Sequence, residues 1–287
     1  MKHDAMIVPP GKRIRLKDFD PAYTAKYKSK DEALEKLGTD IGRLAEYQDV
    51  LYAQNTYALL IIFQAMDAAG KDGTIKHVMS GVNPQGTQVF SFKTPSAEEL
   101  DHDYLWRYHR CVPERGRIGI FNRSYYEELL VVRVHPEFLL NQQLPPGAMK
   151  KNIWERRFEE VNNFERYLVQ NGVEVLKFFL NVSREEQRQR FLARLNTPEK
   201  NWKFSANDAK ERGHWDNYQQ AFEEVFCHTS TKWAPWYVIP ADHKWFARMA
   251  VADIVVAKLK SLNLKYPELD KGRMQELEKS KKLLESE

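Results

Sequence analysis

The residues best suited to chemistry lie in one short segment, Ala65-Met-Asp-Ala-Ala-Gly-Lys-Asp-Gly-Thr74. An apolar run precedes it, and a helix is expected to follow. In that context successive backbone N–H groups point at one place, where the helix dipole adds positive potential, and together they bind phosphate. We interpret the segment as a phosphate-binding loop that uses Ala69, Gly70, Lys71, Asp72, Gly73 and Thr74. The alternative is an ordinary strand-to-helix turn with a solvated lysine.

The loop departs in two places from the pattern G-x-x-x-x-G-K-[ST]. Ala65 stands at the first glycine, and Asp72 replaces the hydroxyl residue that normally helps to hold magnesium. Asp67, inside the loop, can supply a carboxylate for the metal instead. We therefore predict Asp67 as the metal ligand, Mg²⁺ as the cofactor and Mn²⁺ as the alternative ion.

A second pair of polar residues, Asn122-Arg123, directly follows the apolar run at 117–121. Ligands of open α/β sheets lie at the carboxyl ends of the strands, so both residues are expected near the loop. Phosphate-loop kinases commonly carry a metal-binding carboxylate here, which Asn122 replaces with a neutral amide. Arg123 is placed to contact a phosphate. The alternative for Arg123 is a surface salt bridge with Glu127, four residues later.

A basic stretch from Arg184 to Arg212 predicts a lid that closes over phosphates, excludes water and adds positive charge. Acidic neighbours leave open the alternative that part of this stretch is a solvated face. With basic residues elsewhere it would form a cationic track longer than one nucleoside triphosphate requires, which favours a long polyanion as the ligand. The residues assigned to this track are Lys76, Lys93, Arg133, Arg188, Arg190 and Arg194.

The elements that must position these residues alternate along the chain. Strands are predicted at 57–63, 87–92, 117–121, 173–180 and 236–239, and helices at 30–55, 96–110, 153–170, from 183, 213–226 and 242–262, with Ser124 capping one more. This alternation predicts a three-layer α/β/α fold with a parallel central sheet covered by helices on both faces.

The 287 residues fit one domain at 29–264, with an N-terminal arm at 1–28 and a charged C-terminal tail at 265–287. The net charge of +4 does not by itself indicate nucleic acid. Two widely separated cysteines, Cys111 and Cys227, predict neither a disulfide framework nor a zinc site. We expect a cytoplasmic protein without a membrane span, because the sequence shows no signal peptide and no apolar run of about 18 residues.

Several longer strings resemble the polyphosphate kinase 2 family, over about residues 30–262. They are the loop at 65–74, Gly81-Val-Asn-Pro-Gln-Gly86, Asp103-Tyr-Leu-Trp-Arg107, Ile120-Phe-Asn-Arg-Ser-Tyr125, Trp202-Lys-Phe204 and Ala234-Pro-Trp-Tyr-Val-Ile-Pro240. The resemblance implies a phosphate-loop kinase fold with a helical lid. It also implies magnesium-dependent transfer of phosphoryl groups between inorganic polyphosphate and nucleotides, by homodimers or homotetramers.

By the same resemblance, Asp67 is the metal and phosphate-orienting carboxylate and Lys71 the phosphate-loop lysine. Arg123 and the lid residue Arg190 are the transition-state cations. Asn122 resembles the subgroup that phosphorylates both nucleoside mono- and diphosphates, known as class III.

The resulting hypothesis is a reversible kinase that transfers a phosphoryl group from polyphosphate to ADP and AMP, and so regenerates ATP. Adenine nucleotides are the expected acceptors, with guanine nucleotides left open. One alternative is a kinase that uses ATP as donor for a small molecule or nucleotide. The other is a non-catalytic binder of polyanions or nucleic acid, in which Trp202, Phe204, Trp215 and Tyr218 would stack on bases.

Overall fold

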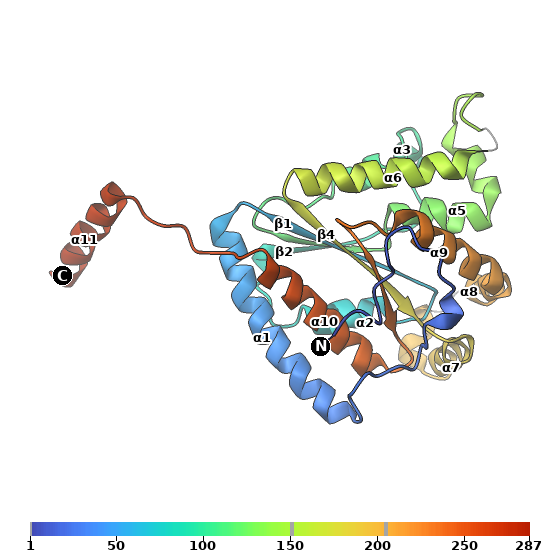
Figure 1. Cartoon of the computed structure of the whole chain (residues 1–287), viewed down its shortest axis with the longest axis horizontal. Helices are drawn as coiled ribbons and strands as arrows, with labels where there is room; N and C mark the ends of the chain where they lie inside the picture. The colour runs from blue at the N-terminus through green and yellow to red at the C-terminus, as the bar shows by residue number, and fades with distance from the viewer. Residues whose placement is uncertain (1, 150–151, 204–205) are drawn as a thin grey trace.

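Five strands pair into one parallel sheet in the computed structural model, which describes residues 2–149, 152–203 and 206–287 (Figure 1). The strands are β1 (Ala58–Ala65), β2 (Thr87–Ser91), β3 (Ile118–Asn122), β4 (Val173–Asn181) and β5 (Trp236–Pro240), in the order β2-β3-β1-β4-β5. All eight residues of β1 are buried, as expected for a central strand covered on both faces. The predicted strands and their parallel arrangement are confirmed.

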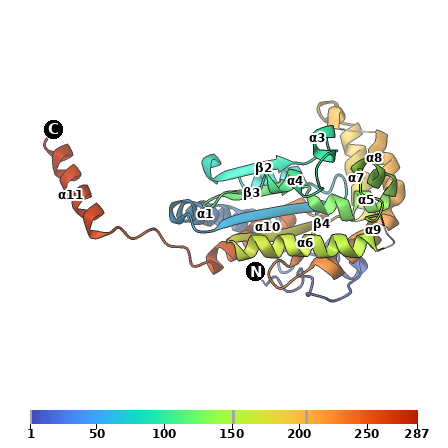
Figure 2. The same ribbon diagram turned by 90° about the horizontal axis from the view of Figure 1, so that it is seen from above.

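Long helices cover both faces of the sheet (Figures 1 and 2). One layer contains α1 (Lys30–Gln54), α2 (Lys71–Val78) and α10 (Lys244–Ser261), which pack on one another. The opposite layer contains α6 (Ile153–Gln170) and α9 (Trp215–Thr229). The predicted three-layer α/β/α architecture is therefore confirmed.

The strand order decides where the polar loops meet. β1 lies between β3 and β4, and its Phe63 stands opposite Asn122 in the β1–β3 register. The loop after β1 and the residues after β3 therefore leave the sheet side by side at its carboxyl edge. That edge is where ligands bind in open α/β sheets.

The expected single helix at 96–110 is wrong, because two short helices occupy this stretch. α3 (Ala97–Leu100) opens with a capping box formed by Ser96 and Glu99, and it ends at Asp101. α4 (Trp106–His109) follows a turn in which the Asp103 carboxylate accepts a hydrogen bond from the Leu105 amide. Aspartate side chains compete in this way for backbone N–H groups, which interrupts a helix.

Short helices connect the larger elements. They are η1 (Leu16–Asp18), η2 (Pro84–Gly86), η3 (Tyr125–Leu129), α5 (Val131–Val134), η4 (Pro136–Gln142), α7 (Arg184–Leu195), η5 (Pro198–Lys203), α8 (Ala206–Glu211) and η6 (Arg212–His214). Ser124 does cap the element that follows it, but that element is the 3₁₀ helix η3. The predicted lid at 184–212 contains α7, η5 and α8. Phe204 of the Trp202-Lys-Phe204 string lies outside the described residues.

The N-terminal arm is anchored to the body of the protein. Ile7 forms an antiparallel bridge with Tyr237 at the free edge of β5, and the buried side chains of Met6, Val8 and Leu16 join the main core. The polar composition of residues 1–28 did not reveal this packing. The domain boundaries at 28 and 264 stay predictions.

The C-terminal helix α11 (Lys271–Glu285) projects away from the body on an extended linker (Figure 1). Every residue of α11 is exposed, in contrast to the N-terminal arm. Among the described residues, no helix has the length and apolar character that a membrane span requires.

The different environments of two methionines predict different stability effects. Met6 is 1% exposed and Met274 on α11 is 57% exposed. We expect Met6→Ala to lower the free energy of unfolding by about 2–5 kcal/mol, because it leaves a cavity in the core. Met274→Ala, the matched control, should change it by less than about 0.5 kcal/mol. Denaturant titration measures both, and equal effects would contradict the anchored arm.

Candidate active site

The loop after β1 forms a tight turn that leads directly into α2. Ala68 and Gly70 both adopt positive φ angles, 60° and 108°, and Gly70 is the N-cap of α2. Glycine adopts such angles without steric cost. The first helical hydrogen bond runs from the Thr74 amide to the Gly70 carbonyl, so the N–H groups of residues 71–73 lie at the open end of the helix. The turn thus presents a set of amide donors suited to phosphate.

Lys71 folds back under this turn. Its side chain is buried, and its Nζ donates to the Ala65 carbonyl at 3.1 Å. Burial and, to a smaller extent, the positive charge of Arg123 lower the pKa of Lys71 to about 8, although nearby carboxylates act in the opposite direction. An anion bound at the turn would favour the charged form of this lysine.

Arg123 joins the two strand ends. Its backbone takes a left-handed conformation, with φ of 67°, and its amide donates to the Phe63 carbonyl of β1. Its guanidinium donates to Asp67 Oδ1 at 2.7 Å and to Glu127 Oε2 at 3.2 Å. The negative charge of Glu127, more than that of Asp67, raises the pKa of Arg123 further above its ordinary value. The salt bridge that the sequence offered as an alternative is therefore present, together with the contact to the loop.

Asn122 makes a second link between these strand ends. Its Nδ2 donates to Asp72 Oδ1 at 2.8 Å and lies 3.5 Å from the Ser91 hydroxyl at the end of β2. Asp72, which replaces the usual hydroxyl residue of the loop, is thus paired with an amide from the neighbouring strand. Asp72 and Asn122, which each replace a residue usual in phosphate-loop kinases, are therefore neighbours in space.

Arg190 of α7 holds the outer side of the loop. It is 8% exposed, and one edge of its guanidinium donates to the carbonyls of Ala69 (2.7 Å) and Ala68 (3.2 Å). The other edge donates to the carbonyls of Ala241 (2.6 Å) and Asp242 (3.1 Å), after β5. In this structure Arg190 therefore contacts the backbone of the loop, and its role as a transition-state cation stays a prediction.

A small cavity of about 40 Å³ lies between the loop and the base of the lid. Asp67, Arg123 and Glu127 form one wall, and Glu211, Arg212 and Tyr218 belong to another. Gln187, which is buried, crosses between them. Its Nε2 donates to the Asp67 carbonyl at 3.0 Å, and its Oε1 accepts from Arg212 Nη1 at 2.7 Å. The lid base is thus hydrogen-bonded to the loop that it was predicted to cover.

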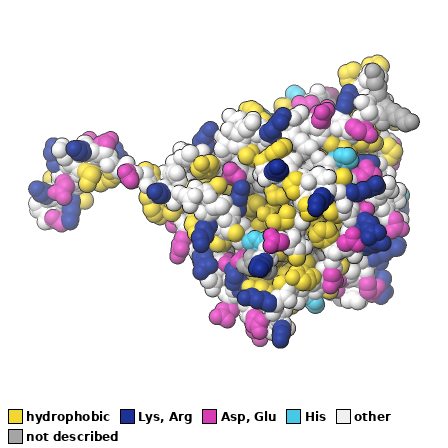
Figure 3. Space-filling view, in the orientation of Figure 1, with side chains coloured by type: hydrophobic (Ala, Val, Ile, Leu, Met, Phe, Trp, Pro, Cys, Tyr) yellow, Lys and Arg dark blue, Asp and Glu magenta, His cyan; other side chains and the backbone are white. Residues whose placement is uncertain are grey.

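Other predicted phosphate-binding residues lie apart from this cluster or are paired elsewhere. Lys76 and Lys93 are exposed. Arg133 pairs with Glu224 and faces the Trp154 ring, Arg188 pairs with Glu185, and Arg194 lies over the Phe191 ring. On the face drawn in Figure 3, Lys and Arg side chains alternate with Asp and Glu. The extended cationic track stays a prediction.

Sequence reasoning did not assign three residues that lie at the site. Glu127 was considered only as a salt-bridge partner, although its position one turn after Arg123 could have indicated a place in the site. Gln187 belongs to the predicted lid helix, but its uncharged side chain gave no reason to assign it to phosphate binding. Arg248 of α10 lies beside Gly73, and its Nη2 is 3.5 Å from the position that a Cβ there would take. Because Arg248 lies far from the loop along the chain, no sequence pattern connects the two.

The carboxylates at the site fit a metal that is held jointly with a substrate. Among the described residues, no group of three His, Cys, Asp or Glu side chains could bind a metal ion alone. Mg²⁺ is commonly bound by one or two carboxylates together with substrate phosphates. Asp67 is 32% exposed beside the phosphate-binding turn and is suited to such a role.

Comparisons with known proteins agree with this geometry. The family model described as polyphosphate kinase 2 matches residues 27–267. The chain belongs to the polyphosphate kinase 2 family. The assignment made from its sequence strings is confirmed.

Two relatives of this polyphosphate kinase 2 family member match nearly their full lengths. An ADP-polyphosphate phosphotransferase of Rhodopseudomonas palustris is 51% identical over 271 residues, which cover 94% of each chain. An AMP/ADP-polyphosphate phosphotransferase of Meiothermus ruber is 46% identical over 262 residues, which cover 91% of this chain and 94% of the relative.

A solved structure supports the fold. The polyphosphate kinase 2 from Arthrobacter aurescens TC1 matches with a TM-score of 0.84 and 38% sequence identity, over 94% of this chain and 97% of that one. The predicted phosphate-loop kinase fold is therefore confirmed.

The lowered pKa of Lys71 predicts pH-dependent anion binding. Below about pH 8 the lysine is protonated and attracts phosphate, whereas above it the free protein loses this charge. Affinity for inorganic triphosphate, measured by calorimetry, should therefore fall as the pH rises from 8 to 10. In Lys71→Arg the charge persists and this fall should be much smaller. An equal fall in both proteins would contradict the assignment.

Proposed function

We propose that this protein transfers the terminal phosphoryl group of inorganic polyphosphate to ADP and to AMP, reversibly. The observation that carries the proposal is the convergence of Lys71, the amides of the loop and the Arg123 guanidinium at the carboxyl edge of β1 and β3. Family membership and the names of the two relatives support polyphosphate as the donor and adenine nucleotides as the acceptors.

The reaction is a direct in-line transfer. A terminal phosphate oxygen of the nucleotide forms a bond to the last phosphorus of the polymer as the bridging P–O bond breaks, so the polymer is shortened by one phosphate. Positioning and charge neutralisation do most of the work in such transfers. Lys71 and the loop amides hold the phosphates, and Arg123 neutralises charge on the oxygens of the transferred group. Glu127 and Asp67 orient Arg123 through its two hydrogen bonds.

Asp67 would hold Mg²⁺, with Mn²⁺ as the alternative ion. When bound, the metal would supply positive charge that neutralises substrate phosphates. Asp67 already accepts a hydrogen bond from Arg123 through Oδ1. The same carboxylate would therefore lie between the Arg123 guanidinium and the Mg²⁺ that binds with the substrate.

Two side chains of α7 would connect the predicted lid to the phosphate-binding loop. Gln187 and Arg190 contact the backbone of Asp67, Ala68 and Ala69, so a movement of α7 would act on the loop directly. The cavity of about 40 Å³ is far smaller than the roughly 300–1,000 Å³ typical of ligand sites. We therefore propose that substrates enter after the lid moves, and that closing it excludes water.

The proposal includes both AMP and ADP as phosphoryl acceptors. It is supported by the Meiothermus ruber relative and by the neutral Asn122, which pairs with Asp72 where a second metal-binding carboxylate could otherwise stand. Guanine nucleotides remain an alternative acceptor. We further propose a cytoplasmic homodimer or homotetramer that takes part in ATP regeneration.

The donor assay tests this function. ADP or AMP is incubated with polyphosphate and Mg²⁺ without any other phosphate donor, and nucleotide products are separated by chromatography. We expect ATP from both acceptors, with ADP as an intermediate from AMP. Lys71→Ala should reduce the rate by about 10²–10³-fold, the usual cost of one such electrostatic contact. Lys279→Ala, on the exposed α11, is the matched control and should retain full rate. Near-full activity of Lys71→Ala would overturn the site.

Arg190→Lys separates charge from shape at the loop. Lysine keeps the positive charge but cannot donate at once to the carbonyls of Ala68, Ala69, Ala241 and Asp242. We expect kcat/KM for polyphosphate to fall by about 10–100-fold, because a displaced loop misaligns the phosphates. Arg188→Lys, on the exposed side of the same helix, should have little effect on the loop. Full activity of Arg190→Lys would contradict the proposal, because it would show that a positive charge at residue 190 is enough for activity without the contacts to the four carbonyls.

A further inference from the structure

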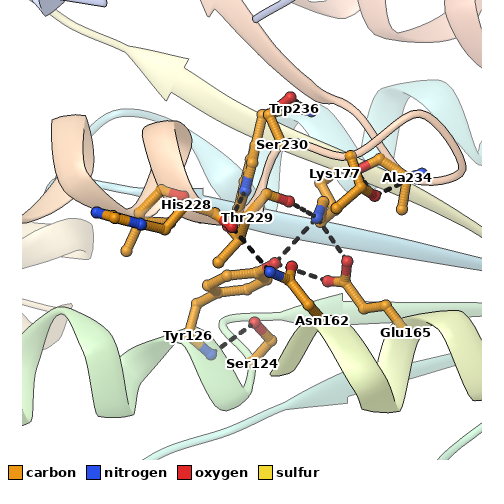
Figure 4. A network of polar contacts seen from close by, with 12 residues as sticks. Ser124, Tyr126, Asn162, Glu165, Lys177, His228, Thr229, Ser230, Ala234 and Trp236 are labelled. Carbon is orange, nitrogen blue, oxygen red and sulfur yellow. Dashed lines mark hydrogen bonds and ion pairs between the residues drawn. The ribbon is translucent and has the colours of Figure 1, made fainter. Parts of the chain in front are cut away.

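A buried charged pair lies between strand β4 of the sheet and helix α6, which covers it (Figure 4). Lys177 of β4 and Glu165 of α6 are both 0% exposed, and Lys177 Nζ donates to Glu165 Oε2 at 2.6 Å. The same ammonium donates to the Thr229 carbonyl at 2.7 Å and to the Tyr126 hydroxyl at 3.0 Å. These three bonds use all three protons of the lysine.

The other carboxylate oxygen receives two tyrosines. The hydroxyls of Tyr126 and Tyr125 donate to Glu165 Oε1 at 2.7 and 2.9 Å. Both tyrosines are fully buried, and burial followed by the charge of Glu165 raises the pKa of each well above its ordinary value. They therefore remain neutral donors, and both oxygens of Glu165 are occupied.

A contribution of this buried ion pair to the stability of the fold does not account for its presence. A buried ion pair gains little over apolar side chains of similar volume, because two charges must be taken out of water. What it does provide is geometry, since each bond has a fixed length and direction. Glu165 and Lys177 join α6, β4, the end of α9 and the start of η3 at one point.

The tyrosines stand between two residues of the proposed active site. Along the chain, Ser124, Tyr125 and Tyr126 separate Arg123 from Glu127. Arg123 has the positive φ of 67°, an unfavourable conformation for a residue with a side chain, so its surroundings must hold it. Within this turn the amide of Tyr126 donates to the Ser124 hydroxyl. The hydroxyls of Tyr125 and Tyr126 connect the same turn to Glu165 in the core.

We propose that Glu165, paired with Lys177, is a positioning residue that fixes Arg123 and Glu127 at the active site through Tyr125 and Tyr126. Glu165 is fully buried and does not contact the phosphate-binding turn, so it acts only through the turn that it anchors. The inference rests on the role proposed for Arg123 in phosphoryl transfer.

A double-mutant cycle tests this role. The hydroxyls are removed in Tyr125→Phe/Tyr126→Phe, once in the natural protein and once together with Arg123→Ala, and kcat is measured with saturating polyphosphate and ADP. In the natural protein we expect kcat to fall at least about tenfold, because Arg123 is no longer held in place. In the Arg123→Ala protein the same change should cost less than about twofold, because the residue to be positioned is absent.

Two outcomes would overturn the inference. One is an unchanged kcat in the natural protein, and the other is an equal fall in both proteins, as expected of a merely structural role. Arg123→Ala alone tests the proposed function separately, because its full activity would refute the role of Arg123 whatever the tyrosines do. If the double variant does not fold, Tyr126→Phe alone carries the same comparison, since Tyr125 and the ion pair remain.

Ser230→Ala is the matched control. The Ser230 hydroxyl is also buried, donates to the Val8 carbonyl and accepts from the Trp236 amide, but it does not contact the tyrosines or Glu165. Its removal should lower the melting temperature while leaving kcat within about twofold. Circular dichroism and thermal unfolding of every variant show whether a lower kcat accompanies an intact fold. A loss of kcat in Ser230→Ala as large as in the tyrosine variants would also overturn the inference.

Discussion

The adjacency of β1 and β3 at the centre of a parallel sheet is the constraint on which the site depends. It sets Phe63 beside Asn122, so the turn after β3 can bond the backbone of β1 through the Arg123 amide. From there the Arg123 guanidinium spans the short gap to Asp67. A strand order in which β1 and β3 were not neighbours would separate the phosphate loop from Arg123, although the two segments themselves would be unchanged.

Positive charge is concentrated around the phosphate loop at an electrostatic cost. Lys71 lies beneath the turn, Arg123 and Arg190 flank it, and Arg248 lies beside its helix. Burial is the main cause that lowers the pKa of Lys71 and of Arg248, and repulsion from Arg123 and Arg190, respectively, lowers each pKa as well. A polyphosphate or nucleotide phosphate relieves it, which gives binding a favourable electrostatic contribution before any lid closes.

Two sets of contacts hold this charged cluster in shape from opposite sides. On the lid side, Gln187 and Arg190 bond the backbone of the loop. On the core side, Glu165 and Lys177 anchor the tyrosines that follow Arg123. In the proposed opening of the lid the first set would move with α7, whereas the second set is buried between the sheet and α6. The proposed lid movement would thus leave one wall of the site fixed while the other opens, and closure would exclude water from the phosphoryl transfer.

The sequence alone determined the local elements and the chemistry of the loop. Apolar runs bounded by turn residues predict all five strands, and Gly70-Lys71 after a buried run predicts the phosphate turn, because these signals depend on neighbours in the chain. The helix expected at 96–110 failed for an equally local reason, because the Asp103 carboxylate accepts a hydrogen bond from the Leu105 amide in the turn between two short helices. Polar composition likewise concealed how Met6 and Val8 anchor the arm.

Tertiary structure decided which distant residues meet. The placement of Gln187 and Arg248 against the loop, the pairing of Asn122 with Asp72 and the burial of Lys177 with Glu165 all join positions far apart in sequence. Their spacing carries no periodic signal, since each contact depends on strand order and helix packing. A lysine within an apolar strand could be noticed in the sequence, but its partner and its connection to Arg123 appear only when α6 packs against the sheet.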